Sequence, residues 1–131
     1  MSERLAHIGI LVHRLAAAAS LYQRLGLPEI GRETFDQENI RIAFVPIEEI
    51  RIELMEPLAA TGSLDRFLAI RGEGIHHLAF EVPDIERALV RARSAGARLI
   101  DESPRRGAHG TRVAFIHPSS AHGVLIELIE R

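Results

Sequence analysis

The sequence predicts an α+β fold in which one βαβββ unit occurs twice. Two observations predict this class: four short segments recur in the same order, and each copy passes from a strand pattern to a helix and then to three more strands. The 131 residues are enough for one domain with its own core. We therefore expect a single domain over residues 1–131, with a first module at about 4–56, a linker helix at about 63–71 and a second module at about 74–130.

The internal repeat consists of four pairs of similar segments that lie about 70 residues apart. Their order is the same in both copies and the spacing changes only slowly, which is difficult to obtain by chance. The pairs are His7–Val12 with His77–Val82, Leu25–Leu27 with Ala95–Ala97, Arg41–Val45 with Arg112–Ile116, and Arg51–Met55 with Leu125–Ile129.

The first copy begins with an apolar, β-branched segment, Leu5–Val12, which predicts a strand. The Ala- and Leu-rich segment Arg14–Leu25 predicts a helix, and Gly26 is typical of the residue that ends one. Three further strands are expected at Glu29–Thr34, Asn39–Val45 and Ile50–Met55.

The second copy follows a short predicted helix, Ser63–Arg71, and begins with the strand His77–Val82. Its helix starts after Pro83 with Asp84 as the N-cap, and runs to Ala95. The three strands after it are expected at Arg98–Asp101, Thr111–His117 and Val124–Ile129.

The composition excludes several function classes. A net charge of −2 offers no basic surface for nucleic acid or an anionic membrane, and 47% hydrophobic with 26% charged residues is typical of a folded soluble domain. The absence of cysteine removes disulfides, thiolate metal sites and cysteine nucleophiles. Because no apolar run approaches the ~20 residues of a membrane span and the N-terminal residues lack a secretory signal, we expect a cytoplasmic protein.

Two histidines and two glutamates occupy equivalent positions in the two copies: His7 and Glu53 in the first, His77 and Glu127 in the second. Because side chains alternate between the two faces of a strand, we expect each His and Glu on the face away from the helix of its own copy. Imidazole and carboxylate ligands suit Zn, Co, Ni, Mn or Fe(II). A metal would offset the cost of burying two carboxylates. The alternative is a structural cluster of hydrogen-bonded polar groups.

The remaining chemical signals are weaker. His76 is expected to be structural, and the other four histidines lie at strand ends or in loops that bind a substrate or simply turn; these are His13, His109, His117 and His122. The chain contains no Gly-rich phosphate loop, no Gly-x-Ser-x-Gly elbow and no His-Glu-x-x-His motif.

With these motifs in place, the whole chain resembles the vicinal oxygen chelate superfamily, which includes glyoxalase I, extradiol dioxygenases and bleomycin-binding proteins. Within that superfamily it is most similar to the methylmalonyl-CoA epimerase family. The segments that carry the resemblance are His7–Ile10, Ile52–Pro57, Gly74–Phe80, Gly107–Gly110, Phe115–Pro118 and Gly123–Leu128.

The resemblance implies one open, U-shaped mixed sheet around a metal site, with His7, Glu53, His77 and Glu127 as ligands. The cofactor would be a divalent ion such as Co, Mn, Ni or Zn. The partner would be a small acyl-CoA substrate, with the 2R and 2S forms of methylmalonyl-CoA interconverted, and neither nucleic acid nor a membrane is implied. Relatives commonly dimerise, which predicts a homodimer.

The reaction needs a group that removes the C2 proton between a thioester and a carboxylate, and a metal-stabilised enolate then follows. We expect Glu127 to be this catalytic base. Some relatives place a second glutamate base near the start of the third strand, but the matching stretch here, Ile40–Ala43, has no carboxylate. Glu33 and Glu38 lie nearby in a shifted register, and Arg41 either holds the substrate carboxylate or is a surface residue. The second base therefore stays open.

Two alternative functions use the same fold. A glyoxalase-type isomerase also uses four His and Glu ligands and proton transfer, and a metal-free drug-binding protein lacks the ligand set. An Fe(II) dioxygenase is disfavoured because it uses two His and one carboxylate, whereas Glu53 adds a fourth protein ligand.

Overall fold

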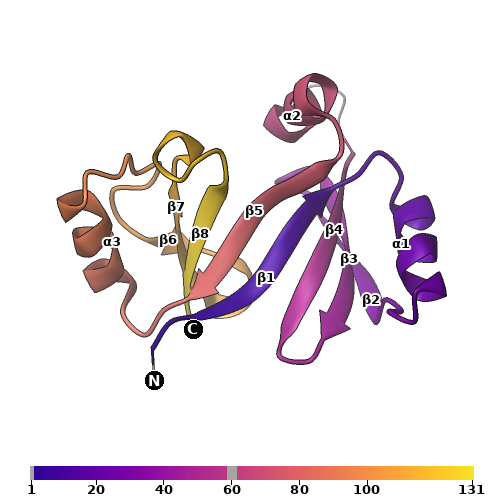
Figure 1. Ribbon diagram of the computed structural model, residues 1–131, viewed down its shortest axis with the longest axis horizontal. Helices are drawn as coiled ribbons and strands as arrows, with labels where there is room; N and C mark the ends of the chain where they lie inside the picture. Colours follow the sequence, from indigo (N-terminus) through magenta and orange to yellow (C-terminus); the bar gives the residue numbers. More distant parts are fainter. Residues whose placement is uncertain (1, 59–61) are drawn as a thin grey trace. The chain divides into compact units, whose positions relative to one another are not determined.

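The helices and strands follow the predicted order in the computed structural model, which describes residues 2–58 and 62–131 (Figure 1). The bounds of most elements agree with the prediction to within two residues. The elements are β1 Arg4–Leu11, α1 Leu15–Arg24, β2 Gly31–Phe35, β3 Ile40–Ile47, β4 Ile50–Pro57, α2 Ser63–Arg71, β5 Gly74–Glu81, α3 Ile85–Ser94, β6 Arg105–Arg106, β7 Arg112–Ile116 and β8 Leu125–Glu130.

The strands form one mixed sheet in the order β2-β3-β4-β1-β5-β8-β7-β6. The pairs β1–β4 and β5–β8 are parallel, and the pairs β2–β3, β3–β4, β6–β7 and β7–β8 are antiparallel. Because β2 and β6 end the order without pairing to each other, the sheet is open. The predicted α+β class with a single mixed sheet is confirmed.

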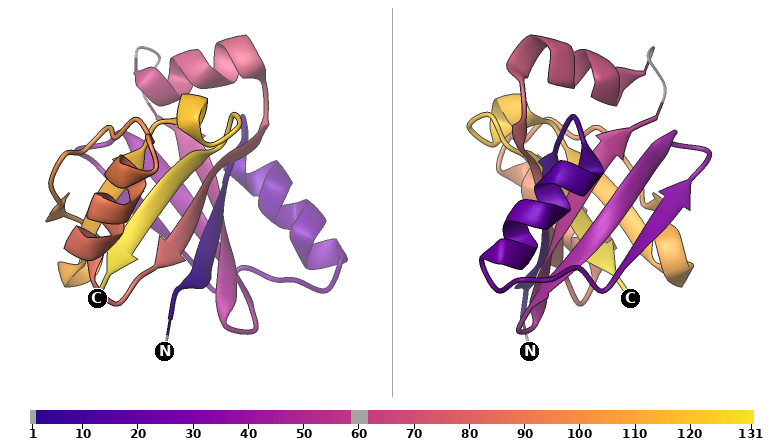
Figure 2. Two further views of the ribbon diagram at one scale, coloured as in Figure 1. Left: turned by 60° about the vertical axis from the view of Figure 1, so that its left-hand side comes forward. Right: turned by 90° about the vertical axis from the view of Figure 1, so that its right-hand side faces the viewer.

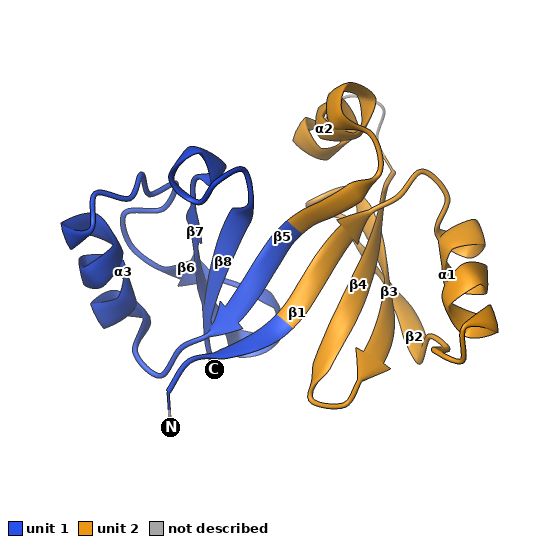
Figure 3. Ribbon diagram, viewed as in Figure 1, with its two compact units in different colours: residues 1–6, 77–131 blue, residues 7–76 orange. Residues whose placement is uncertain are grey.

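By its contacts the chain divides into two compact units, which Figure 3 colours separately. We call residues 7–76 the first unit, and residues 1–6 with 77–131 the second unit. Each unit carries one copy of the repeat. In each, a parallel strand pair (β1–β4 or β5–β8) adjoins an antiparallel pair (β3–β4 or β7–β8).

Helices pack on both faces of the sheet in the first unit (Figure 2). On one face, Leu15 and Ala19 of α1 pack against Leu54 and its neighbours on β3 and β4. On the other face, Leu68 of α2 packs against Leu11 and a group of apolar strand residues that includes Ile40, Ile42 and Met55. Helix α2 therefore packs on the same face of β4 as Glu53, because Met55 and Glu53 are two residues apart on that strand.

The second unit packs α3 on one face only. Ile85 and Leu89 of this helix contact Ala114 and Leu128 of the sheet. The predicted N-cap is confirmed, since the side chain of Asp84 accepts a hydrogen bond of 3.1 Å from the backbone N–H of Arg87. None of the helices in the described ranges has the length and apolar character that a membrane span requires.

Both repeat helices end in the same way. Gly26 after α1 and Gly96 after α3 have φ angles of +85° and +84°, a conformation that costs glycine little because it has no side chain. The chain can therefore reverse sharply after each helix and return to the sheet, as the sequence predicts for Gly26.

One predicted strand, Arg98–Asp101, is wrong. This segment runs beside β7 but forms only an isolated bridge between Leu99 and Ile116. The reason is a side chain: the carboxylate of Asp101 accepts a hydrogen bond of 2.8 Å from the backbone N–H of Phe115, a group that a regular ladder would pair with backbone. The short strand β6, Arg105–Arg106, pairs with β7 instead.

Candidate metal and proton-transfer site

The first unit holds His7 and Glu53 side by side on its central parallel strands. Glu53 on β4 lies in register with Gly9 on β1, one pleat along from His7 on the same face. The distance from His7 Nδ1 to Glu53 Oε2 is 3.4 Å, and both residues are buried, with 6% of their surface exposed. A carboxylate in such a place must be paired, because an isolated buried charge is costly.

Arg51 is the second partner of this carboxylate. Its Nε donates a hydrogen bond of 2.9 Å to the same oxygen, Glu53 Oε2, and its guanidinium lies 5.0 Å from the centre of the Phe44 ring. Glu53 therefore lies between a buried imidazole and a half-exposed guanidinium. The sequence analysis missed this contact, although residues two apart on a strand share a face.

The second unit holds an equivalent pair, His77 on β5 and Glu127 on β8. The distance from His77 Nε2 to Glu127 Oε1 is 3.4 Å, and Glu127 lies in register with Ala79 as Glu53 lies in register with Gly9. His77 is 7% exposed. Each predicted His–Glu pair is thus brought together within its own unit. That the four residues act as ligands, and that Glu127 acts as a base, stay predictions.

Two arginines of the second unit, Arg112 and Arg105, have carboxylate partners. Arg112 binds the carboxylates of Glu86 and Glu130, and these hydrogen bonds, chiefly the one to Glu86, raise the pKa of its guanidinium above the ordinary value. Arg105 lies 3.3 Å from the carboxylate of Asp101 and over the ring of Phe115. These two arginines have carboxylate partners within their own unit.

The three charged residues near β3 that the sequence analysis considers are Arg41, Glu33 and Glu38, and the structure places them differently. Arg41 follows Ile40 and precedes Ile42, both on the face of Glu53, so its side chain lies on the opposite face with α1. Glu33 lies directly opposite Ile42 and therefore shares the face of Glu53. Glu38 is exposed in the turn between β2 and β3.

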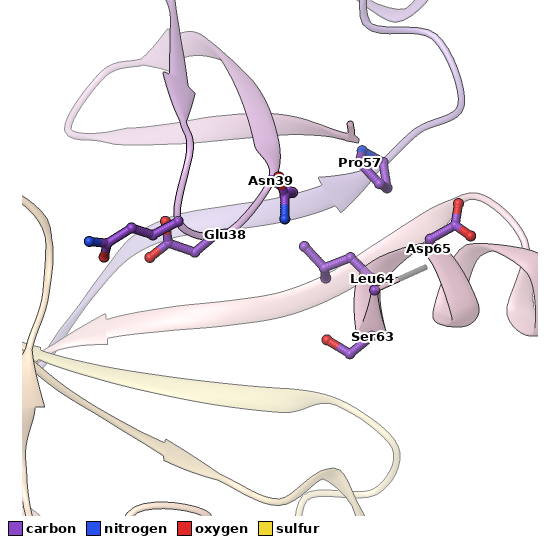
Figure 4. Close-up of a pocket in the computed structure, with 8 residues that line it drawn as sticks. Glu38, Asn39, Pro57, Ser63, Leu64 and Asp65 are labelled. Atoms are coloured by element: carbon purple, nitrogen blue, oxygen red, sulfur yellow. The ribbon is translucent and has the colours of Figure 1, made fainter. Parts of the chain in front are cut away.

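Glu38 lines a pocket of about 330 Å³ between this turn and the start of α2 (Figure 4). Figure 4 shows Glu38 at one end of the pocket and Asp65 at the other. The lining residues are Gln37, Glu38, Asn39, Pro57, Gly62, Ser63, Leu64 and Asp65. None of the four predicted ligands is among them, so this pocket is separate from both His–Glu pairs.

The other histidines have local structural roles where their contacts are known. The ring of His76 packs edge-on against Phe67 of α2, with ring centres 4.9 Å apart, as expected for a structural residue. His117 Nδ1 accepts a hydrogen bond of 3.0 Å from the backbone N–H of Ser119. His109 and His122 adopt left-handed backbone conformations in turns, with φ of 58° and 57°.

Comparison with known proteins identifies the class. The family model described as the Glyoxalase/Bleomycin resistance protein/Dioxygenase superfamily matches residues 6–115. The uncharacterised protein YqjC of Bacillus subtilis is 39% identical over 97% of this chain and 91% of its own length. The ethylmalonyl-CoA/methylmalonyl-CoA epimerase of Cereibacter sphaeroides is 37% identical over 98% of both chains.

A solved structure extends the likeness to three dimensions. A methylmalonyl-CoA epimerase in complex with methylmalonyl-CoA and NH4+ superposes with a TM-score of 0.87 at 33% identity, covering 99% of this chain and 95% of the other. The chain belongs to the Glyoxalase/Bleomycin resistance protein/Dioxygenase superfamily. Its likeness to epimerases over nearly its full length identifies it as an enzyme of the isomerase class.

Proposed function

We propose that this enzyme interconverts (2R)- and (2S)-methylmalonyl-CoA in a metal-dependent reaction, by removing the C2 proton and returning it to the other face. The observation that carries the proposal is the pair of buried His–Glu contacts at equivalent positions of the two repeats. Relatives named as epimerases support the substrate.

The donor set fits a divalent metal. We propose that His7, Glu53, His77 and Glu127 bind one ion, because two imidazoles and two carboxylates suit Zn, Co, Ni or Mn. Burial supports this role, since His7, Glu53 and His77 are buried and apolar residues such as Met55 and Ile129 share the strand faces of Glu53 and Glu127, where ionised groups need compensation. When bound, the ion would supply a positive charge that stabilises the negative charge developing on the thioester.

Glu127 is the proposed catalytic base. Its side chain is 14% exposed, against 8% for Glu53, so it is the more accessible of the two carboxylates. The carboxylate accepts the C2 proton while the electron pair of the broken C–H bond moves into the thioester. Acceptance of a proton by a carboxylate ligand needs one oxygen that remains available to the substrate.

The decisive experiment is an exchange assay. Purified protein is incubated in D₂O with (2S)-methylmalonyl-CoA, and both the 2R product and deuterium at C2 are measured. We expect both to appear, to be lost with a chelator, and to return on addition of Co²⁺. A metal-loaded protein that produces neither, but isomerises the glutathione adduct of methylglyoxal, would replace this proposal by the glyoxalase-type one. Activity that persists without metal would refute the metal dependence.

We also propose that the enzyme works as a homodimer in the cytoplasm, in line with the family resemblance. Light scattering on the purified protein tests the dimer, for which the expected mass is twice that of the chain. Fractionation of cells that express the natural gene tests the location.

A further inference from the structure

We infer that Arg51 binds the carboxylate on C2 of the substrate, and so selects malonyl-type acyl-CoA esters over esters that lack this group. The inference deepens the proposed function and rests on it. Such a substrate carries two kinds of anionic group: a carboxylate on the reacting carbon, and phosphates at the far end of the long pantetheine arm. The contacts of Arg51 favour the first kind.

The guanidinium of Arg51 is held in place by Glu53 and Phe44. Its Nε donates a hydrogen bond of 2.9 Å to Oε2 of Glu53, and its central carbon, Cζ, lies 5.0 Å from the centre of the Phe44 ring. A cation over an aromatic ring is attracted to it, and a side chain that is already fixed loses less conformational entropy when it binds a ligand. Arg51 is therefore pre-organised for recognition.

These contacts leave one edge of the guanidinium available. Glu53 uses Nε, and neither Nη1 nor Nη2 has a hydrogen-bond partner among the residues that the structure describes. The edge formed by Nη1 and Nη2 presents parallel N–H groups that match the two oxygens of a carboxylate. The side chain of Arg51 is 41% exposed, so an anion can reach this edge from solvent.

The sheet face that carries Arg51 is filled at one end and exposed at the other. At the filled end, Met55 of β4 and Ile42 of β3 pack against α2. Arg51 lies four residues back along β4, ~13 Å from Met55, and its neighbour on β3, Pro46, is exposed. A ligand at Arg51 therefore needs none of the space that α2 and its apolar cluster occupy.

The contact with Glu53 indicates which anion Arg51 binds. Glu53 is a proposed metal ligand, and Arg51 contacts its carboxylate directly. The C2 carboxylate of the substrate is attached to the carbon next to the thioester carbonyl, so it stays close to the reacting atoms, whereas the phosphates of CoA do not. The equivalent residue of the second copy, Leu125, has no donor for a carboxylate, so this role belongs to the first unit.

The test measures binding as well as turnover. Wild type, Arg51→Gln and Arg41→Gln, all saturated with Co²⁺, are titrated by calorimetry with racemic methylmalonyl-CoA and with propionyl-CoA, which has the same thioester and phosphates but no carboxylate on C2. We expect Arg51→Gln to bind methylmalonyl-CoA roughly tenfold more weakly and propionyl-CoA as the wild type does. Arg41→Gln is the matched control, because it removes the same charge from the opposite face of the sheet.

The two ligands separate carboxylate recognition from a structural role. If Arg51 acts only by holding Glu53, Arg51→Gln weakens both ligands equally, and the inference is overturned. Equal affinity of the wild type for the two ligands, or the same selective loss in Arg41→Gln, also overturns it. Arg51→Lys is the second variant: it keeps the charge without the paired N–H groups, and should recover part of the lost affinity.

The D₂O exchange assay keeps the two failures distinguishable. A protein that epimerises methylmalonyl-CoA but shows no selective loss in Arg51→Gln refutes the inference and leaves the proposed function in place. A protein that shows the selective loss but neither exchanges nor epimerises methylmalonyl-CoA supports carboxylate recognition by Arg51 and refutes the epimerase function.

Discussion

The two His–Glu pairs have the same framework but different neighbours. In both units a ring nitrogen of the histidine lies 3.4 Å from a carboxylate oxygen of the glutamate. A phenylalanine, Phe44 or Phe115, lies directly opposite the glutamate on the neighbouring strand. Two residues before the glutamate the units differ: Arg51 binds Glu53 in the first unit, whereas the same place before Glu127 is Leu125. The repeat has kept the His–Glu contact, through Nδ1 of His7 and Nε2 of His77, and has changed the charge beside it.

This difference suggests a division of labour. Arg51 holds one oxygen of Glu53 in a hydrogen bond, which fixes that carboxylate in place and suits a ligand. Leucine at the matching position can donate no such hydrogen bond to Glu127. The outer strands β2 and β6 also differ in charge. The residue opposite Ile42 in the first unit is the acid Glu33, and the residue opposite Val113 in the second unit is the base Arg105.

The largest effect is expected when one of the four proposed metal ligands is removed. His77→Ala should remove most of the bound metal and abolish epimerisation, because an imidazole ligand is lost. The matched control is His76→Ala, one residue earlier, which removes a ring that packs on Phe67. Metal analysis and turnover measure both variants. Full metal content with normal turnover in His77→Ala would show that the second pair is not a metal site.

Substitution of the two glutamates tests the division of labour directly. Glu127→Gln should slow epimerisation by roughly 10²–10⁴-fold, because the amide cannot accept the proton. Glu53→Gln should cost much less, because an amide oxygen can still act as a ligand. Steady-state kinetics on both metal-loaded variants give the comparison. Equal losses in the two variants would mean that the units do not differ in role.

The sequence predicted the part of this comparison that depends on periodicity. The repeat locates both pairs, and strand alternation predicts that His7 and Glu53 lie on the face away from the helix of their copy. The contact between Arg51 and Glu53 could also have been predicted, since both residues lie on that face. The repeat gives no sign of it, because the residue that matches Arg51 in the second copy is Leu125.

Other features depend on tertiary contacts that no local pattern encodes. Residues Arg98–Asp101 do not form a regular strand. The carboxylate of Asp101 accepts the hydrogen bond from the Phe115 N–H that a backbone carbonyl would accept in a regular ladder. The facing of Glu33 depends on the turn between β2 and β3, where Asn39 adopts a φ of 52° and sets the register. The sequence had left Glu33 and Glu38 equally placed.

Arg51→Leu gives the first unit the residue found in the second. It should lower the free energy of unfolding of the metal-free protein by about 1–2 kcal/mol, because buried Glu53 loses a charged hydrogen bond and the arginine is 41% exposed. It should also tighten metal binding by roughly tenfold, since a cation beside the site is removed. Urea unfolding with and without Co²⁺ measures both changes.

The control for this variant is Arg105→Leu, which removes the arginine over Phe115 in the second unit. That arginine binds Asp101, so its loss should leave metal affinity unchanged. Weaker metal binding in Arg51→Leu would instead mean that the arginine orients Glu53 for the ion, and the charge argument would be wrong.

The smallest effect concerns one surface glutamate in each unit, Glu81 and Glu29. The pKa of Glu81 is lowered by its hydrogen bond from Arg131 and, to a smaller extent, by Arg4. The pKa of Glu29 is lowered by its hydrogen bond from Arg32. The partners of Glu81 are distant in sequence and are lost on unfolding, whereas Arg32 is three residues from Glu29. Glu81→Gln should therefore cost up to about 1 kcal/mol at pH 7, and Glu29→Gln less.

The sign of the pH dependence follows from the lowered pKa. A carboxylate with a lower pKa in the folded state than in the unfolded state contributes its stability above the unfolded value, near pH 4.3, and loses it as the pH falls through the folded value. Urea unfolding of the metal-free protein should thus show a difference between wild type and Glu81→Gln at pH 7 that is smaller at pH 3. A difference of the same size at both pH values would mean that Glu81 stabilises the second unit by packing, with no contribution from its charge.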